Sequence, residues 1–473
     1  MDTKKLRQKI LDLAIRGKLV PQDPNDEPAS VLLERIRAEK EQLIKEGKIK
    51  RTKKSNASDT SHYENVLFDL PQNWEWTTLE NICSKIGSGS TPRGGNYSHN
   101  GIPFFRSQNV HNNGICYNDI KYINNETHQS MIGTEVHPND VLLNITGGSL
   151  GRCAVVPSSF YIGNVSQHVC ILRPILVIPE YLHAFILSEF FNRNMKVSGS
   201  GREGLPKNSL EIMAFPLPPL NEQVRIVSQI QSLMSLIDDL NTNKVLLDRS
   251  ISQCKQVILT LAITGKLTTQ LATDIPAIEL LKTINPKYTS TDNRHYENVP
   301  NGWQFVKIKD VFTINPKNKV DDDLEAGFVS MSMIDESYRD SYQFEKKKWA
   351  LIKTGFTHFK DGDIAVAKIS PCLENRKSMI LKNLPNGIGA GTTELHVFRS
   401  AIVYPKFALY FFKSDYFINH CVGTFNGVVG QQRVGKHIIE DIIFPLPPYE
   451  EQKKISEKII HIFQCLDKIT AEL

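Results

Sequence analysis

The chain has 473 residues, of which 40% are hydrophobic and 23% charged, and its formal net charge is +5. This length predicts two to four domains, and the composition is that of an ordinary globular protein. No apolar run approaches the roughly 20 residues that span a bilayer. The eight cysteines form no CxxC pair and the histidines show no zinc-ligand spacing, which argues against structural zinc or a disulfide framework. No secretory leader is visible, so we expect a cytoplasmic protein with no membrane contact.

The first segment, residues 1–70, is predicted to be a helical region followed by a linker. Leu6, Ile10 and Leu13 recur at helical spacing within LRQKILDLAIRGKL. Residues 37–54 are rich in Lys and Arg. This basic stretch is either a solvated helix end running into a flexible linker or a site of non-specific phosphate contact.

The next segment, residues 71–214, has a different texture. Short β-prone runs, such as residues 140–146 and 168–174, are separated by clusters of Gly, Asn and Pro. A helix-like stretch follows at residues 179–195. The pattern predicts a globular α+β domain with a mostly antiparallel sheet.

The central segment, residues 215–299, is predicted to contain one long helix. Pro219 suits its start and Gly265 its C-terminal end. Apolar residues step by four and three between these limits, as in a coiled-coil seam with one interruption at Lys244. The seam residues are Ile226, Ile230, Leu233, Ile237, Leu240, Leu247, Ile251, Cys254, Ile258 and Leu261.

The remainder of the chain repeats what precedes it. FPLPPLNEQVRI at residues 215–226 returns as FPLPPYEEQKKI at 444–455, and residues 6–19 return at 254–267. HYENV also occurs twice, at 62–66 and 295–299. Residues 300–443 therefore predict a second α+β domain, and residues 444–473 a C-terminal helix. Its seam residues are Ile455, Ile459, Ile462, Leu466 and Ile469.

The repeat implies that the long central helix has a twin that is split between the two chain ends. We predict that this split helix packs antiparallel against the continuous one, with Met1 close to Leu473. The alternative is that both helices pack separately onto their neighbouring domains. The predicted fold is α+β, with two globular domains separated by a long antiparallel coiled-coil-like helical pair in a pseudo-two-fold circular repeat.

Several matches to catalytic motifs are weak. GSGREG at residues 199–204 satisfies GxGxxG without a clear βαβ context, and GQQRVGKH at 430–437 has His437 where a phosphate loop needs Ser or Thr. The carboxylates Asp335 and Glu345, with Lys347, stand in a charged run, and no NPPY- or DPPY-like tetrapeptide occurs. We predict no catalytic residue and no metal site. The two copies share only a glycine-rich turn with a Lys, which is either structural or a close approach to a phosphate backbone.

A family resemblance covers nearly the full length. LPQNW at 70–74 with VPNGW at 299–303, the two PLPPxxEQ signatures, the LAIxGKL helix ends, and residues 89–110 and 362–377 together resemble the specificity subunits of type I DNA restriction–modification systems. In this chain family-like sequence also precedes the first domain, in residues 1–36. Not every member of the family has such a segment.

The resemblance implies a DNA-reading scaffold. Two target-recognition domains would each read one half of a split site in double-stranded DNA, and the helices would set the spacing and bind two methyltransferase (modification) subunits. The restriction (motor and nuclease) subunits would join through that core. The chain itself would be non-catalytic and hold no cofactor: S-adenosylmethionine would belong to the methyltransferase partner, and ATP and Mg to the restriction partner.

Candidate DNA contacts are polar residues on domain loops, because Arg can pair with guanine and Asn or Gln with adenine. For each residue, surface solvation is an equal alternative. The first domain contributes Arg93, Arg106, Gln108, Asn109, Arg152, Arg202 and Lys207. The second contributes Lys317, Asn318, Lys368, Arg376, Lys377, Gln431, Gln432, Arg433 and Lys436.

Two rival functions remain open. One is a self-sufficient restriction or modification enzyme, against which the missing methyltransferase and nuclease motifs argue. The other is a coiled-coil adaptor that binds only protein, which predicts no sequence-dependent DNA footprint.

Overall fold

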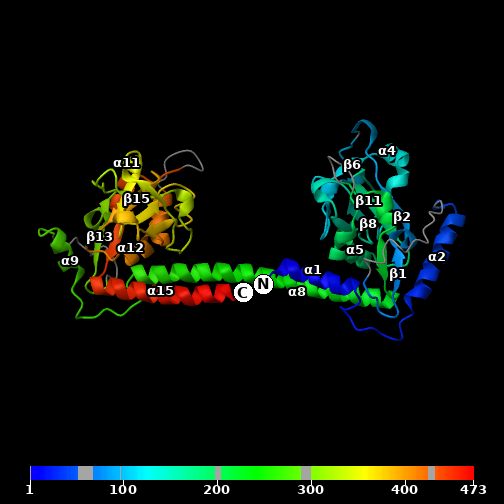
Figure 1. The fold of residues 1–473 in the computed structure, drawn as a ribbon, viewed down its shortest axis with the longest axis horizontal. Coiled ribbons are helices and arrows are strands. Elements are labelled where there is room, and N and C mark those ends of the chain that lie inside the picture. Colours follow the sequence, from blue (N-terminus) through cyan, green and yellow to red (C-terminus); the bar gives the residue numbers. More distant parts are fainter. Residues whose placement is uncertain are drawn as a thin grey trace. The chain divides into compact units, whose positions relative to one another are not determined.

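The computed structural model describes residues 2–51, 68–95, 97–197, 204–288, 300–423 and 432–472. It divides into two compact units, unit 1 (Met1–Asn243) and unit 2 (Lys244–Leu473), and the division falls inside helix α8 (Leu220–Ile263) (Figure 1). The long helix predicted between Pro219 and Gly265 is therefore confirmed as one continuous element of 44 residues. The five-segment division predicted from the sequence is finer than these two units and stays a prediction.

Unit 1 contains one α+β domain between its helices. Strands β2, β11, β8 and β9 form one four-stranded sheet in that order, strands β6, β3, β10 and β7 form a second, and the β1–β12 and β4–β5 pairs complete the domain. The helices are α1 (Thr3–Ile15), α2 (Ala29–Lys45), α3 (Leu79–Ile82), α4 (Asn125–Ser130), α5 (Pro179–Leu187), α6 (Glu189–Asn194) and α7 (Lys207–Glu211). The strands are β1 (Glu75–Thr78), β2 (Cys83–Ser88), β3 (Ile102–Phe105), β4 (Val110–His111), β5 (Gly114–Ile115), β6 (Lys121–Ile123), β7 (Glu135–Val136), β8 (Val141–Asn144), β9 (Cys153–Val155), β10 (Gly163–Val165), β11 (Val169–Pro174) and β12 (Ala214–Leu217).

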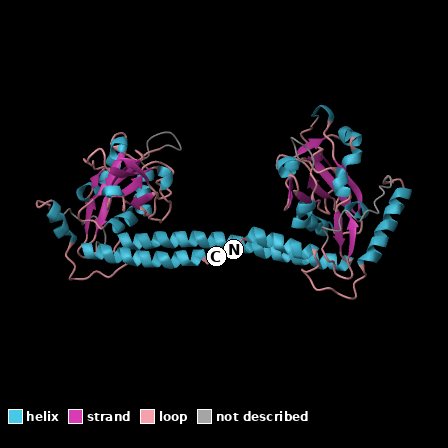
Figure 2. Ribbon diagram, in the orientation of Figure 1, coloured by secondary structure: helices cyan, strands magenta, loops and turns pink. Residues whose placement is uncertain are grey.

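Unit 2 repeats the two four-stranded sheets and the outer strand pair of unit 1, and among its described residues it has no strand pair that matches β4–β5. Its sheets run β14-β21-β18-β19 and β16-β15-β20-β17, with the β13–β22 pair matching β1–β12. Figure 2 shows that strands form the centre of each domain, with helices around them. The helices are α9 (Ala277–Ile284), α10 (Ile308–Val311), α11 (Trp349–Ile352), α12 (Pro405–Phe412), α13 (Asp415–Val422), α14 (Lys436–Asp441) and α15 (Tyr449–Ala471). The strands are β13 (Gln304–Lys307), β14 (Thr313–Ile314), β15 (Glu325–Val329), β16 (Glu345–Lys348), β17 (Thr357–Lys360), β18 (Ile364–Ala367), β19 (Ser378–Ile380), β20 (Ile388–Gly391), β21 (Leu395–Arg399) and β22 (Ile443–Leu446).

The predicted α+β class with mostly antiparallel strands is confirmed in both domains. The only parallel pairings among the described strands are β3 with β10 and β15 with β20. The central strands β8 (VLLN) and β18 (IAVA) are buried at every position, which explains why they read as continuous apolar runs. Each domain thus has a rigid two-sheet core that can carry variable loops.

In each unit two helices run antiparallel, as predicted. In unit 1, Arg7 pairs with Asp238 at 2.5 Å while Gln22 reaches back to Glu222 at 2.7 Å, so α1 and α8 run in opposite directions. In unit 2, Lys255 pairs with Asp467 at 2.5 Å, and α15 lies beside the C-terminal half of α8 (Figure 1). The predicted proximity of Met1 and Leu473 concerns residues outside the described ranges.

The seam is broader than a coiled-coil stripe. Leu11, Ala14 and Ile15 of α1 are buried although they lie beside the predicted seam positions. The reason is that α1 packs on α5 and α6 as well as on α8, which widens its apolar face. The predicted seam residues divide into buried (Ile10, Ile226, Ile237, Ile251, Ile455, Ile459), half-buried (Leu6, Leu13, Ile230, Leu233, Leu247, Ile258, Leu261, Ile462, Leu466) and exposed (Cys254, Leu240 at 48%, Ile469 at 46%).

A buried glutamate joins each domain to its helices. In unit 1 the Trp74 indole donates to Glu222 at 2.9 Å and Gln22 donates to the other carboxylate oxygen at 2.7 Å. Burial raises the pKa of Glu222, and these two donors oppose the rise. The same contacts recur in unit 2, and we call each set the Trp–Glu staple. It links the entry of the domain, the start of one helix and the end of its partner.

The helix end at each staple requires glycine. Gly17 and Gly265 adopt φ values of 65° and 69° just after α1 and α8. A Cβ at Gly265 would lie 2.2 Å from Pro300 Cγ, and one at Gly17 would lie 2.3 Å from Pro71 Cγ. The LAIxGKL repeat is therefore explained by a left-handed helix cap pressed against the Pro of the domain entry.

Unit 2 also buries a lysine, which makes its stability depend on pH. Lys413 follows α12, is 0% exposed and donates to the carbonyl oxygens of Ser337 at 2.9 Å and Arg376 at 2.8 Å. Burial lowers its pKa from 10.5 to about 7. Between these values the unfolded chain binds a proton that the folded unit does not, so stability should rise with pH, by at most about 1.4 kcal/mol per pH unit.

The variant Lys413→Met should lose this slope. Urea unfolding at pH 7, 8 and 9, followed by hydrogen exchange in unit 2, measures it. Equal slopes for wild type and variant would show that Lys413 does not titrate in this range.

Candidate nucleic-acid interface

Loops from several strands meet at one edge of the first domain. Asn144 at the end of β8 donates to the Ser107 carbonyl after β3 at 2.8 Å. Ile145 N donates to His168 O at 3.0 Å, and Leu205 N to Ile145 O at 2.9 Å. We define rim 1 as residues 106–109, 144–149, 166–168 and 204–205. A rigid sheet edge that carries polar loops is the usual setting for base-reading side chains.

The second domain builds the matching edge from the equivalent strands. Ser370 N donates to Gln432 O, and Val434 N donates to Lys368 O, both at 2.9 Å. Lys368 N reaches Glu394 O at 3.0 Å. We define rim 2 as residues 330–333, 368–377, 392–394 and 432–434. The backbone frame of the two rims is alike, whereas their side chains differ.

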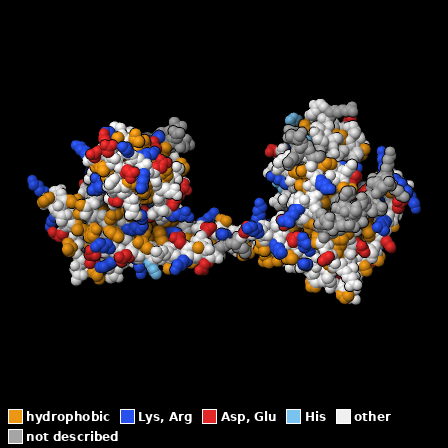
Figure 3. All heavy atoms as spheres, in the orientation of Figure 1, with side chains coloured by type: hydrophobic (Ala, Val, Ile, Leu, Met, Phe, Trp, Pro, Cys, Tyr) orange, Lys and Arg blue, Asp and Glu red, His pale blue; other side chains and the backbone are white. Residues whose placement is uncertain are grey.

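Charge on rim 2 is paired. Arg433 makes two hydrogen bonds to Glu394, at 2.7 and 2.9 Å, and these hold the pKa of Glu394 below its usual range. Burial lowers the pKa of His396 to about 4, so this imidazole beneath the rim is neutral at pH 7. Figure 3 likewise shows Lys and Arg side chains interspersed with Asp and Glu over the visible face of the second domain. A nucleic-acid contact on this rim would therefore depend more on the local placement of donors than on overall charge.

Of the first-domain candidates, Gln108 on rim 1 is exposed, as is Arg152 at the start of β9. Arg106 is half-buried and donates to Asp119 O at 2.6 Å. Lys207 is exposed and pairs with Glu211 at 3.1 Å. Arg202 and the side chain of Arg93 lie outside what the structure describes.

Asn109 has a structural role instead of the predicted base contact. It is 0% exposed, and its amide donates to the carbonyl oxygens of Cys116 and Asn118 and accepts from the backbone of Arg106. With both amide hydrogens donated and the side chain buried, Asn109 has no free donor for adenine. It shapes the loop that carries Gln108.

In the second domain Lys368, Gln432 and Arg433 come together on rim 2, and Lys436 lies close by at the start of α14, paired with Glu440 at 3.3 Å. Gln431 lies outside the described residues, as do most of the glycine-rich 199–204 turn and both HYENV copies. Lys317 is exposed and directly precedes Asn318, which lines the pocket beside α11.

Three further candidates in this domain make internal contacts. The Asn318 amide donates to Phe359 O at 2.7 Å and accepts from Arg399. Arg376 donates to Lys413 O and Asp415, and Lys377 donates to Met331 O at 3.2 Å. Asn318 and Arg376 thus use donors inside the domain, Asn318 on strand β17 and Arg376 at the end of α12 and the start of α13, and their DNA contact stays a prediction.

The structure adds residues that the sequence interpretation missed. Gln167 in rim 1 and Thr393 in rim 2 are exposed at the equivalent turn before β11 and β21. His168 contacts Thr146 at 2.7 Å in the same turn of the first domain. The runs 168–174 and 394–400 were recognisable as repeated strands, and the turn ahead of each could have been proposed on that basis.

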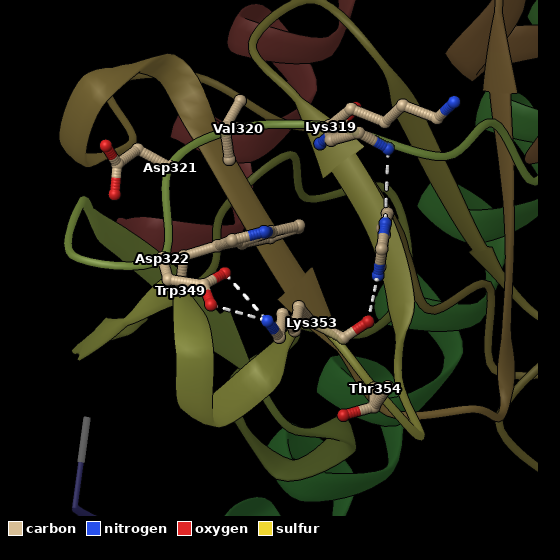
Figure 4. A pocket seen from close by; sticks show the side chains of 9 residues that line it. Lys319, Val320, Asp321, Asp322, Trp349, Lys353 and Thr354 are labelled. Carbon is tan, nitrogen blue, oxygen red and sulfur yellow. Dashed lines mark hydrogen bonds and ion pairs between the residues drawn. The ribbon is translucent and has the colours of Figure 1, made fainter.

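A pocket of about 700 Å³ lies beside α11 in the second domain (Figure 4). Trp349 is among the residues that line it, and Lys353 is held by Asp322 at 2.6 and 2.8 Å. His358 accepts from Asn318 N at 3.2 Å through one ring nitrogen and bonds Lys353 O at 2.8 Å through the other. The lining residues of the pocket lie outside the ranges that define rim 2, and Asn318 is the one DNA-contact candidate among them.

The described residues contain neither a cluster of metal ligands nor a membrane-spanning helix. Within those ranges, no three His, Cys, Asp or Glu side chains gather as metal ligands would. Likewise, no described helix combines the length and apolarity needed to cross a membrane.

Comparison with known proteins identifies the family to which the chain is related. The family model for the type I restriction modification DNA specificity domain matches twice, at residues 71–246 and 300–473. The EcoAI specificity subunit of Escherichia coli is 38% identical over 239 residues, 46% of this chain and 40% of that protein. The EcoKI specificity subunit of E. coli K12 is 21% identical over 388 residues, covering 79% of this chain and 77% of that protein. The matches to EcoAI and to the similar EcoEI subunit span only about two-fifths of those relatives' lengths.

Solved structures agree in fold. The HsdS subunit from Thermoanaerobacter tengcongensis superposes with a TM-score of 0.55 at 16% identity, over 86% of this chain and 93% of that one. A chain solved for work on complex assembly and conformational transition of the type I R-M system gives 0.58 at 16% identity, over 86% and 94%. At such identities the likeness shows the fold alone. Since the family model covers most of the sequence in two copies, the chain belongs to the type I restriction–modification DNA specificity family.

Proposed function

We propose that this chain is the sequence-reading subunit of a type I restriction–modification complex and recognises a bipartite site in double-stranded DNA. The proposal rests on the contrast between the structural features that repeat in the two units and the side chains that differ between them. The staples, helix caps and sheet order are the same in both units, whereas the rim side chains differ. Two domains that share a backbone frame but differ in their rim side chains are suited to reading two different half-sites.

The helices supply the scaffold in this proposal. Repeated helix pairs offer two similar surfaces, which suits two copies of a methyltransferase subunit, and restriction subunits would join that assembly. Transfer of the methyl group from S-adenosylmethionine, and the ATP- and Mg-dependent steps, would belong to those partners in the cytoplasm. The chain itself would contribute binding and positioning and no catalytic residue.

The test is to express the chain with and without its methyltransferase partner and to sequence the methylated positions in DNA. We expect two different half-sites at a constant spacing, methylated only when both proteins are present. Methyl transfer by the purified chain alone would support the self-sufficient enzyme. An assembled complex without a sequence-dependent footprint would support the protein-only adaptor.

Gln108→Ala should relax one base position in one half-site. Gln108 is exposed on rim 1, and loss of a bidentate base contact costs about 1–3 kcal/mol of discrimination. Competition binding with single-base variants of each half-site measures this. Gln432→Ala is the reciprocal control and should affect only the other half-site, and a uniform loss across all sequences would mean that Gln108 contacts phosphate or supports the fold.

A further inference from the structure

A loop of the second domain reaches from the sheet to the helices of unit 2. Residues 335–341, which we call the Tyr338 loop, are closed by the hydrogen bond from Asp335 N to Ser341 O at 3.2 Å. Its base is held on its own domain, because Lys413 donates to Ser337 O and Lys406 pairs with Asp340 at 2.7 Å. The loop is therefore a firm projection of the domain.

The tip of the loop seats an aromatic ring between two helices. The Tyr338 ring lies 5.4 Å from the Phe463 ring on α15, edge to face at 77°. The Lys255 ammonium on α8 lies 5.4 Å from the same ring, and the Arg376 guanidinium lies 5.5 Å from it. The Tyr338 hydroxyl donates to Ser252 O at 3.4 Å. Ring–ring and cation–ring contacts thus converge on one side chain.

The helix side of this contact belongs to the repeated part of the chain. Lys255, Phe463 and Asp467 occupy the places that Arg7, Met234 and Asp238 hold in unit 1. There Arg7 pairs with Asp238 at 2.5 Å and contacts Met234 Sδ at 3.3 Å, just as Lys255 pairs with Asp467 and lies over Phe463. The interhelical ion pair is common to both units.

The two units differ in how far the basic residue of this ion pair is exposed to solvent. The side chain of Lys255 is 10% exposed, whereas that of Arg7 is 32% exposed. Phe463 also contacts Tyr410 of α12 at 5.8 Å, and the corresponding residue of α5 is Ala184. The second domain therefore packs on its helices through the rings of Tyr338, Phe463 and Tyr410, and unit 1 has Met234 and Ala184 in place of the last two.

A second difference lies at the end of the domain helix. In unit 1 Gln8 of α1 donates to Leu187 O at the end of α5 at 3.2 Å. The matching carbonyl in unit 2, Lys413 O, accepts from Arg376 Nε at 3.1 Å. Arg376 also lies over the Tyr338 ring, so the same residue ties the helix end to the Tyr338 loop.

We propose that the Tyr338 loop fixes the orientation of the second recognition domain on its helix pair, and that Tyr338 is a positioning residue for spacer discrimination. The inference rests on the proposed function, that of reading a bipartite site. The staple at Glu451 holds the domain at one point of α15. Phe463 is twelve residues further along the helix (463 − 451), about 18 Å at 1.5 Å per residue, so the second contact restrains rotation about the first.

Removal of the Tyr338 ring should weaken the preference for one spacer length without altering which bases are recognised. For Tyr338→Ala in the assembled complex, the preference for the best spacer over spacers one base pair shorter or longer should fall about tenfold, the scale of one aromatic pair plus a cation–ring contact. The half-site letters should stay the same. Tyr338→Phe should remain within about twofold of wild type, since the hydroxyl bond is long.

The measurement is binding of the complex to duplexes that differ only in spacer length. Tyr342→Ala is the matched control: this tyrosine is four residues away, but its hydroxyl bonds Lys382 O at 2.8 Å within the domain. Its spacer preference should equal that of wild type. Phe463→Met introduces the residue that unit 1 has at this position and should lower the spacer preference by a smaller factor. It tests the same contact from the helix side if Tyr338→Ala does not fold.

The outcomes separate the two proposals. Spacer preference that is unchanged in both Tyr338→Ala and Phe463→Met, or lowered equally by Tyr342→Ala, would overturn the positioning role and leave the proposed function standing. A wild-type complex with no preferred spacer would overturn the proposed function and this inference with it. Faster hydrogen exchange in residues 335–341 and 252–256 of Tyr338→Ala, with β18 and β21 still protected, would confirm that the contact was lost from a folded domain.

Discussion

Insertion of four residues after Lys244 should lengthen the preferred DNA spacer while both half-sites keep their sequences. Lys244 lies within α8, the single helix that joins the two units. Four residues add about 6 Å to a helix, which corresponds to about two base pairs at 3.4 Å each, with a rotation of about 40°. The measurement is the set of methylated sites in cells that carry the variant and its methyltransferase partner.

The surroundings of Lys244 suit such a change. The flanking residues from Thr242 to Leu246 are exposed, so an insertion there disturbs no buried contact. Replacement of residues 242–246 by alanine at constant length is the control and should leave the spacer unchanged. A seven-residue insertion adds about 10.5 Å with a rotation of only about 20° and should extend the spacer by about three base pairs. Altered half-site letters at constant spacing would contradict the role of α8.

Glu451→Ala should destabilise unit 2 by about 3 kcal/mol, because hydrogen bonds to a buried charged group contribute about 1.5–3 kcal/mol each and the donors left behind lose their partner. Glu451 is 0% exposed and accepts from the Trp303 indole at 2.8 Å and from Gln270 at 2.8 Å. The alanine variant leaves the buried indole N–H without an acceptor. Urea titration read by hydrogen exchange in peptides of unit 2 measures the loss.

Two matched variants make this result specific. Glu450→Ala removes the neighbouring carboxylate, which is 63% exposed and pairs with Lys453, and should change stability by less than about 0.5 kcal/mol. Glu222→Ala removes the equivalent staple and should destabilise the peptides of unit 1. If Glu450→Ala and Glu451→Ala behaved alike, the staple would have no special part in the fold.

The helices were the most predictable part of the chain. The four-and-three spacing from Ile226 to Leu261 defined α8, and Gly265 marked its end, because helix periodicity and left-handed caps are local properties. The exposure of Leu240 and Ile469 was not predictable, since it depends on how far a partner helix extends past each position. The burial of Leu11 and Ile15 depends in the same way on packing against α5.

The two rims were predictable as regions and less so as residues. Gln108, Lys368 and Gln432 lie on the rims, as residue type and loop position suggested. Asn109 and Asn318 carry the same kind of side chain, but their amide groups make hydrogen bonds inside the domain. A sequence shows which side chains can pair with a base, whereas only the path of the loop decides which of them has a free donor.

The sequence by itself determined the doubled organisation, the long central helix with its repeat at the two ends of the chain, and the family, because these follow from periodicity and from the comparison of one copy with the other. The tertiary structure decided which repeated residues act together: the Trp–Glu staple joins residues 148 positions apart in both units. It also decided where the units differ, since Tyr338 gains its contacts only when a loop from the sheet folds onto Lys255 and Phe463. Contacts between distant segments depend on the packing of whole elements, and that packing leaves no local pattern in the chain.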